Sequence, residues 1–197
     1  MPAATPQLYL ARHGETEWSL SGQHTGTTDI PLTPNGAAQA RNLGARLAGV
    51  EFAHVWSSPR ARAIRTAELA GLGDRVEVVA DLAEWDYVDY EGLKTDEIQA
   101  RHPGWLIYRD GCPGGESPAE VAARADRVIA RLRAVGGRAI TFSHGHFTRI
   151  LAVRWLGLPV LDARHLAIST AALGVLAHDG KSGDPVIELW NDHHHAD

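Results

Sequence analysis

Short apolar runs alternate with amphipathic stretches along this 197-residue chain, and this alternation limits the possible folds more than any other feature. Strands are predicted where the apolar runs lie, at residues 7–11, 53–56, 76–79 and 138–142. Helices are predicted to begin at Thr33 and to cover residues 60–72, 116–135 and 147–156. Strands and helices in this order indicate an α/β fold, a three-layer α/β/α sandwich with a mostly parallel central sheet.

The remaining segments complete a single domain over residues 1–197. Two late apolar runs, 173–177 and 186–189, predict a hairpin, which adds an antiparallel edge strand to the sheet. Residues 82–115 are predicted to be irregular, apart from one short helix at 95–101.

Composition excludes several classes of partner. The formal net charge is −5, from 19 Lys and Arg against 24 Asp and Glu, so no broad basic face for nucleic acid is expected. No apolar run approaches the roughly 18 residues of a membrane span. The single Cys112 cannot form an internal disulfide, which indicates a reducing compartment, and the protein is predicted to be cytoplasmic. Flexible ends are expected at residues 1–6 and in a histidine-rich tail at about 191–197.

Two of the predicted strands end in a similar polar pattern, "RHG" after the first and "SHG" after the fourth. In parallel α/β sheets ligands bind beyond the carboxyl ends of the strands, so His13 and His144 are expected to face one pocket. Arg12 belongs to the first pattern, and Arg62 follows another strand end, "SSP". Two guanidinium groups and two imidazoles make a small cationic cup that suits a phosphate dianion.

A metal site is the alternative for these histidines, because His144 and His146 have an HxH spacing. The guanidinium group next to His13 repels a cation, so phosphate is favoured over metal. The glycines that follow the two strand-end histidines, Gly14 and Gly145, let a ligand approach the backbone closely.

The segments "LARHGETEW", "SSPRARAIRTAELA", "LAEWDY", "GGES" and "FSHGH" together resemble the histidine phosphatase superfamily, the phosphoglycerate-mutase-like proteins. The resemblance runs from Leu8 to Thr148, and the motifs occur in the order and spacing of the family. Within the family, the chain most resembles small phosphatases of the fungal sedoheptulose-bisphosphatase type and similar bacterial phosphomonoesterases.

The resemblance implies a metal-independent phosphomonoesterase without a cofactor. His13 is then the nucleophile that accepts the phosphoryl group on a ring nitrogen, and Glu84 is the general acid that protonates the leaving group. Glu91 is the other candidate acid, although the family motif disfavours it. The groups implied to bind the transferring oxygens are Arg12, Arg62 and His144.

The resemblance also implies where the rest of the substrate binds. The partner is a small phosphate ester, and a homodimer through an edge strand is the family-level expectation. Glu15 and Thr16 are expected to hold the loop after the nucleophile in place. The candidate substrate-binding residues are Gly14, Ser19, Thr25, Gly26, Trp85, Tyr87, Gly145 and His146.

Hydrolysis is favoured over mutase activity. The cofactor-dependent mutases of the family carry an insertion with an Arg-Arg pair after the acid loop, and residues 90–115 contain no such pair. One set of cationic groups for retaining a bisphosphate is therefore missing, which favours water as the phosphoryl acceptor. The alternatives are a bisphosphoglycerate-dependent phosphoglycerate mutase and a non-catalytic phosphate-binding module.

Overall fold

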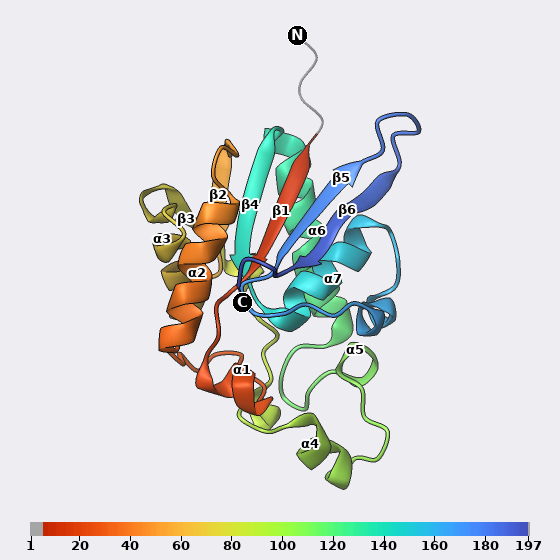
Figure 1. Cartoon of the computed structure of the whole chain (residues 1–197). Coiled ribbons are helices and arrows are strands. Elements are labelled where there is room, and N and C mark those ends of the chain that lie inside the picture. The colour runs from red at the N-terminus through yellow and green to blue at the C-terminus, as the bar shows by residue number, and fades with distance from the viewer. Residues whose placement is uncertain (1–5, 197) are drawn as a thin grey trace.

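One mixed β-sheet forms the centre of the computed structural model, which describes residues 6–196 (Figure 1). Within that range the sheet has six strands in the order β3-β2-β4-β1-β5-β6. They are β1 (Gln7–Arg12), β2 (His54–Ser57), β3 (Val76–Val78), β4 (Arg138–Ser143), β5 (Leu173–His178) and β6 (Pro185–Asp192). The first four run parallel, β5 is antiparallel to β1, and the edge strand β6 is antiparallel to β5. The predicted sheet is confirmed.

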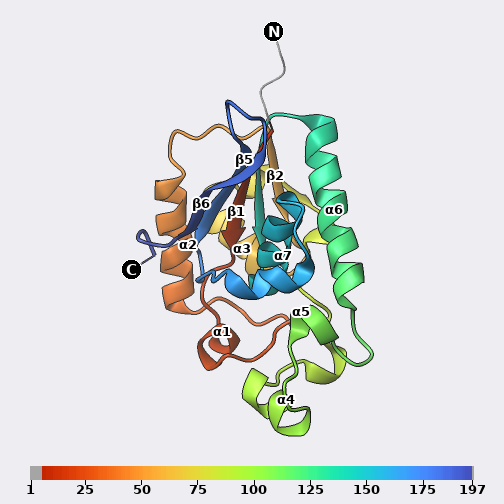
Figure 2. The same cartoon turned by 90° about the vertical axis from the view of Figure 1, so that its right-hand side faces the viewer.

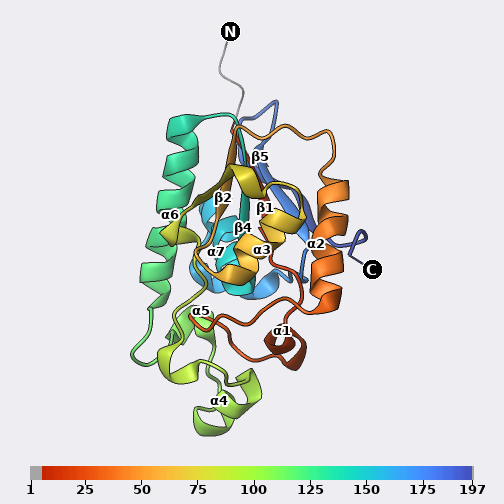
Figure 3. The same cartoon turned by 90° about the vertical axis from the view of Figure 1, so that its left-hand side faces the viewer.

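Four helices of the described chain cover the two faces of this sheet: α2 (Pro34–Arg46), α3 (Ala61–Leu69), α6 (Pro118–Val135) and α7 (Gly145–Trp155). The shorter helices α1 (Glu17–Ser21), α4 (Thr95–Arg101) and α5 (Ile107–Asp110) lie beyond the end of the sheet (Figure 1). Short 3-10 turns lie at Gly73–Arg75, Ala80–Leu82, Val88–Tyr90 and Val160–His165. The side views show α2 and α3 on one face and α6 and α7 on the other (Figure 2, Figure 3), each pair packed on its own apolar core. The predicted three-layer sandwich is confirmed. None of the helices within residues 6–196 has the length and apolar character needed to cross a membrane.

The sequence pattern does not predict α1 and α5, which have only five and four residues. None of the α1 residues is buried, so its sequence shows no helical periodicity of apolar residues. A capping box specifies it instead: Thr16 accepts from the Ser19 amide at 3.1 Å, and Ser19 accepts from the Thr16 amide at 2.9 Å. Thr16 therefore orders the loop after His13, as expected.

The C-terminal segment is more ordered than the predicted tail. Asn191 and Asp192 belong to β6, and the Asn191 side chain accepts from the Ser169 amide at 2.7 Å. The His195 ring Nε2 lies 2.9 Å from the Ala171 carbonyl oxygen. The polar sequence from residue 191 predicts a flexible tail. In the structure, the pairing of β6 with β5 and these two side-chain contacts fix the segment to the domain. The flexible N-terminus that the sequence predicts lies, apart from Pro6, outside the described residues, as does residue 197.

The carboxyl ends of three parallel strands meet at one edge of the sheet. Arg12 of β1 pairs in register with Ser143 of β4, and the His13 amide donates to the Ser143 carbonyl at 2.9 Å. The Ser58 amide, just after β2, donates to the Phe142 carbonyl at 2.9 Å. The two His-Gly segments are therefore neighbours, as the predicted sheet requires.

The start of α2 holds the loop that follows His13. The Glu15 carboxylate accepts from the Thr33 hydroxyl at 2.6 Å and from the Asn35 amide at 3.0 Å. The Glu15 amide in turn donates to the Gln39 side chain at 3.0 Å. Where α2 comes closest to the loop after His13, their backbones are in direct contact. A Cβ on Gly36 would lie 2.1 Å from the Glu15 carbonyl oxygen. Only glycine fits there.

Gly36→Ala is expected to lower the free energy of unfolding by about 1–3 kcal/mol, because the added methyl group overpacks the contact between α2 and the loop. Chemical denaturation with equal m-values for both proteins measures the difference. The control is Gly180→Ala, since nothing lies within 4 Å of a Cβ at Gly180. Equal stability of the two variants would contradict the expected clash.

Candidate active site

The imidazole of His13 lies just beyond the carboxyl end of β1, buried and held in one tautomer. Its Nδ1 is 2.7 Å from the carbonyl oxygen of Gly14. A carbonyl oxygen only accepts, so Nδ1 carries the proton and Nε2 carries a lone pair. Burial, followed by the charges of Arg62 and Arg12, lowers the pKa of His13 well below its ordinary value. The ring is therefore neutral near pH 7, and Nε2 can act as a nucleophile.

Three buried nitrogen atoms near His13 have no hydrogen-bond partner among residues 6–196: Nε of Arg12, Nε of Arg62 and Nδ1 of His144. The centroids of the His13 and His144 rings are 5.2 Å apart. A buried polar atom without a partner costs about 1–3 kcal/mol, so three of them beside His13 indicate a site for ligand oxygens.

Backbone carbonyls fix the two guanidinium groups. Arg12 donates to the carbonyl of Ile168 at 2.7 Å. Arg62 donates to the carbonyls of Thr25 and Thr28 at 2.8 and 2.9 Å. Neither arginine has a carboxylate partner within the described chain. Burial lowers the pKa of Arg12 to about 10, which leaves the group charged near pH 7. The cup is thus cationic and rigid.

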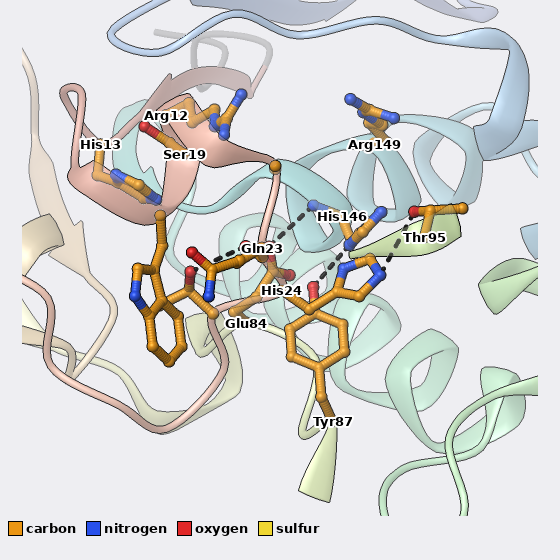
Figure 4. A pocket seen from close by; sticks show the side chains of 14 residues that line it. Arg12, His13, Ser19, Gln23, His24, Glu84, Tyr87, Thr95, His146 and Arg149 are labelled. Carbon is orange, nitrogen blue, oxygen red and sulfur yellow. Dashed lines mark hydrogen bonds between the residues drawn. The ribbon is translucent and has the colours of Figure 1, made fainter. Parts of the chain in front are cut away.

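The Glu84 side chain lies against the first turn of α7. One carboxylate oxygen accepts from the amides of Trp85 and Phe147 at 3.0 and 2.9 Å. The other accepts from the His146 amide at 2.9 Å, a bond drawn in Figure 4. Because Glu84 and His13 line the same cavity, the carboxyl group can exchange a proton with a substrate bound at His13.

A cavity of about 210 Å³ lies beside His13. Its walls come from the end of β1 with the loop that follows, from the loop that carries Glu84, and from the start of α7 (Figure 4). The predicted site residues that line it are Arg12, His13, Ser19, Thr25, Glu84, Tyr87, Gly145 and His146. Arg62 and His144 are not among its lining residues; they are buried next to His13.

One wall of the cavity is polar but uncharged. The Tyr87 hydroxyl lies 2.6 Å from Nδ1 of His146, and the Tyr87 ring stacks on His24 with centroids 4.9 Å apart. Burial raises the pKa of Tyr87 and lowers the pKa of His146 well below its ordinary value. Burial also lowers the pKa of His24 to about 4. Near pH 7 this wall offers neutral hydrogen-bonding groups.

The structure places three predicted substrate-binding residues away from the cavity lining: Gly14, Gly26 and Trp85. Trp85 is fully buried, and its indole N–H donates to the Glu116 carbonyl at 2.8 Å. The Gly26 amide donates to the Glu91 carboxylate at 2.9 Å. That carboxylate also accepts from the Thr28 amide, so Glu91 ties a loop together and does not line the cavity.

Comparison with known proteins agrees with this geometry. The model of the histidine phosphatase superfamily (branch 1) matches residues 8–193. The chain belongs to the histidine phosphatase superfamily. A Mycobacterium tuberculosis protein named acid phosphatase is 46% identical over 173 residues, which cover 86% of this chain and 85% of that protein. A Saccharomyces cerevisiae protein named sedoheptulose 1,7-bisphosphatase is 40% identical in an alignment over 192 residues, and the match covers 81% of this chain and 71% of that protein.

A solved structure is also similar to this histidine phosphatase. The product of the open reading frame Rv3214 of Mycobacterium tuberculosis superposes with a TM-score of 0.90 at 40% sequence identity, covering 95% of this chain and 98% of that one. The family and the fold class that the sequence predicts are both confirmed.

Besides Trp18, the lining of this histidine phosphatase cavity includes five residues that the sequence does not predict: Gly22, Gln23, His24, Thr95 and Arg149. Arg149 lies four residues after Gly145 on α7, so the helical period was a usable signal for it. Thr95 reaches the site because the Gln23 and Lys94 backbones pair in an isolated bridge. No sequence pattern predicts the backbone pairing of Gln23 with Lys94.

The two histidines of the HxH pattern turn to different partners. His144 Nε2 lies 2.7 Å from the Ser58 hydroxyl, whereas His146 Nδ1 lies 2.6 Å from the Tyr87 hydroxyl. Among residues 6–196, no group of three or more His, Cys, Asp or Glu side chains is arranged to hold a metal ion.

Arg124 of α6 braces the loop that carries Glu84. Its guanidinium group donates to the carbonyls of Asp81 and Ala83 at 2.7 and 2.9 Å. The same group forms two 2.7 Å bonds to the Glu116 carboxylate, in a mostly buried ion pair. The position of Glu84 therefore depends on a side chain that does not line the cavity.

Proposed function

We propose that this histidine phosphatase is a phosphomonoesterase, a phosphoric monoester hydrolase that acts on a small phosphorylated metabolite such as a sugar phosphate or bisphosphate. One observation carries the proposal: Arg12, Arg62 and His144, each with a buried nitrogen that has no partner in the described chain, lie close to His13, whose Nε2 carries a lone pair. Phosphoryl transfer requires chiefly in-line positioning and charge stabilisation, which this arrangement supplies. The names of the two similar proteins, an acid phosphatase and a sedoheptulose 1,7-bisphosphatase, support the same activity.

The first step transfers the phosphoryl group to the enzyme. Nε2 of His13 attacks phosphorus, an N–P bond forms, and the P–O bond to the leaving group breaks. The electron pair of that bond goes to the leaving oxygen, which takes a proton from Glu84. Arg12, Arg62 and His144 bind the three non-bridging oxygens while charge shifts among them.

The second step hydrolyses the phosphohistidine. Water attacks phosphorus and gives a proton to the Glu84 carboxylate, and the N–P bond breaks with its electron pair returning to Nε2 of His13. Phosphate leaves, and both residues return to their starting states. The sum is ester plus water giving alcohol plus phosphate, with no cofactor or metal in the proposed cycle. We place this activity in the cytoplasm and in carbohydrate metabolism.

Trapping the intermediate tests the proposal. Quenching of the enzyme in alkaline denaturant during turnover of a phosphomonoester labelled with ³²P is expected to leave alkali-stable label on His13, which acid treatment then releases. Label on another residue, or hydrolysis without any label, would overturn the mechanism. Binding of phosphate without turnover would favour the non-catalytic alternative. Faster formation of 2-phosphoglycerate than of phosphate from 3-phosphoglycerate would favour the mutase.

Arg124→Met is expected to reduce kcat on an alkyl phosphate by roughly ten- to a hundredfold, because a displaced Glu84 protonates the leaving group poorly. The loss on p-nitrophenyl phosphate is expected to be much smaller, since its leaving group needs little protonation. Steady-state kinetics on both substrates measures the ratio.

The matched control is Arg127→Met. Arg127 lies on the same helix and pairs with the Asp81 carboxylate at the surface, without contacting the loop carbonyls. Arg127→Met is expected to leave kcat unchanged on both the alkyl phosphate and p-nitrophenyl phosphate. Equal losses on both substrates in Arg124→Met would mean that Arg124 supports the fold in general and does not position the acid.

A further inference from the structure

Ser58 carries a buried hydroxyl beside the cationic cup, and the proposed steps do not use it. The residue follows β2, and its amide donates to the Phe142 carbonyl of β4 at 2.9 Å. Its Oγ accepts from the amide of Arg60, the residue before the first turn of α3, at 3.2 Å. The side chain is fully buried. Both the backbone and the hydroxyl oxygen of Ser58 are therefore fixed between β4 and α3.

The hydroxyl of Ser58 contacts the ring of His144. Its Oγ lies 2.7 Å from Nε2 of His144, which is fully buried as well. Burial, followed by the charge of Arg62, lowers the pKa of His144 well below its ordinary value, so the ring is neutral near pH 7. A neutral imidazole carries one N–H, and the hydrogen bond at one ring nitrogen decides which nitrogen holds the proton.

The contact between Ser58 and His144 allows two arrangements of protons. If Nε2 carried the ring proton, it would donate to an Oγ that already accepts from the Arg60 amide. The buried hydroxyl proton of Ser58 would then have no acceptor among residues 6–196. If the hydroxyl donates to Nε2 instead, all three groups are paired. A buried donor without an acceptor is costly, so the second arrangement is favoured.

The second arrangement puts the ring proton of His144 on Nδ1. This is the nitrogen of His144 that is buried without a partner in the described chain. The ring centroid lies 5.2 Å from that of His13. An N–H group at this place can donate to an oxygen of the phosphoryl group that His13 accepts, whereas a lone pair on Nδ1 would repel that oxygen.

We propose that Ser58 is a positioning residue: its hydroxyl donates to Nε2 of His144 and so keeps the proton on Nδ1, the nitrogen that donates to the phosphoryl group. The catalytic consequence rests on the proposed phosphatase activity, but the tautomer does not. Both histidines of the site then carry their proton on Nδ1 and present opposite nitrogens to the substrate. His13 offers the lone pair of Nε2, and His144 offers the N–H of Nδ1.

Nuclear magnetic resonance of the protein labelled with ¹⁵N-histidine tests the tautomer directly. Long-range ¹H–¹⁵N correlations report which ring nitrogen is protonated, and the His144→Gln variant assigns the signals of His144 by their loss. In the wild-type protein near pH 7, His144 is expected to carry its proton on Nδ1. In Ser58→Ala, the form protonated on Nε2 is expected to appear.

The same Ser58→Ala variant is expected to lower kcat by roughly ten- to a hundredfold. Complete removal of such a donor costs about a hundred- to a thousandfold, and here the ring itself remains. The loss is expected to be equal for glycerol 3-phosphate and p-nitrophenyl phosphate, because the donor acts on the phosphoryl oxygens and not on the leaving group. Steady-state kinetics on both substrates measures it.

Two further variants separate this role from a structural one. Ser58→Thr keeps the hydroxyl, and it is expected to keep the proton on Nδ1 and to recover part of kcat. Thr141→Val removes a different buried hydroxyl, which donates to the Tyr9 carbonyl at 3.2 Å within the sheet, and it is expected to change neither the tautomer nor kcat.

A proton on Nε2 of His144 in the wild-type protein would overturn the inference. So would a Ser58→Ala variant that keeps the wild-type kcat, or one that loses activity while His144 stays protonated on Nδ1. Absence of all hydrolysis and of label on His13 in the wild-type protein would instead overturn the proposed function, because the tautomer of His144 is measured without turnover.

Discussion

His13→Ala is expected to reduce kcat for phosphomonoester hydrolysis by roughly four to six orders of magnitude, the range typical of removing a catalytic nucleophile. The reason is that the proposed first step uses the lone pair on Nε2 of His13. His144 lies beside His13, but its Nε2 is engaged by the Ser58 hydroxyl. Phosphate release from p-nitrophenyl phosphate, together with labelling of the alkali-quenched enzyme, measures the loss.

The His13 variant is expected to stay folded, because the backbone bond from residue 13 to Ser143 does not involve the side chain. Circular dichroism and thermal unfolding check this point. His102→Ala serves as the control, since His102 is exposed at the end of α4, and it is expected to keep full activity. Residual hydrolysis above one per cent in His13→Ala would contradict the covalent mechanism.

Glu84→Gln is expected to slow alkyl phosphates by roughly two to four orders of magnitude, the usual contribution of a general acid. An amide cannot donate the proton that an alkoxide leaving group requires. The p-nitrophenolate leaving group needs almost no protonation, so its release is expected to fall far less. Comparing kcat for glycerol 3-phosphate and p-nitrophenyl phosphate measures this difference.

Glu91→Gln is the matched control for the acid. Glu91 also accepts backbone amides, but its partners are Gly26 and Thr28, and it does not line the cavity. Any decrease in kcat of the Glu91→Gln variant is expected to be the same for the alkyl phosphate and for p-nitrophenyl phosphate. If Glu84→Gln lowered kcat by the same factor for glycerol 3-phosphate and p-nitrophenyl phosphate, Glu84 would have a structural role and another residue would have to be the general acid.

The elements with strong local signals could be predicted from the sequence. Apolar runs marked the parallel strands, and α6 begins with a local signal of its own, the capping box that Ser117 and Glu120 form. The short helices α1 and α5 lack such a period; the capping box of Thr16 and Ser19 specifies α1, whereas α5 has no side-chain cap at its start. The ordered segment around Asn191 was missed for a related reason, since β-pairing and contacts with Ser169 lie far away in sequence.

Some residues of the candidate site could likewise be predicted from the sequence, whereas the orientation of others could not. Motif order was enough to nominate His13, Glu84 and Arg62, because each follows a strand or sits in a recognisable loop. Motif order also nominated Trp85, which the structure places in the core, where its indole N–H bonds to Glu116. A sequence motif reports that a residue belongs to the site region, but it does not report which way the side chain points.

The sequence by itself determined the α/β order, the family and the strand-end residues, because apolar period, helix caps and motif spacing are local properties of the chain. Only the tertiary structure decided the tautomer of His13, the brace from Arg124 and the place of Arg149 in the cavity wall. Each of these depends on which hydrogen-bonding and charged groups meet across separate loops, and that is settled only when the sheet and its helices pack together.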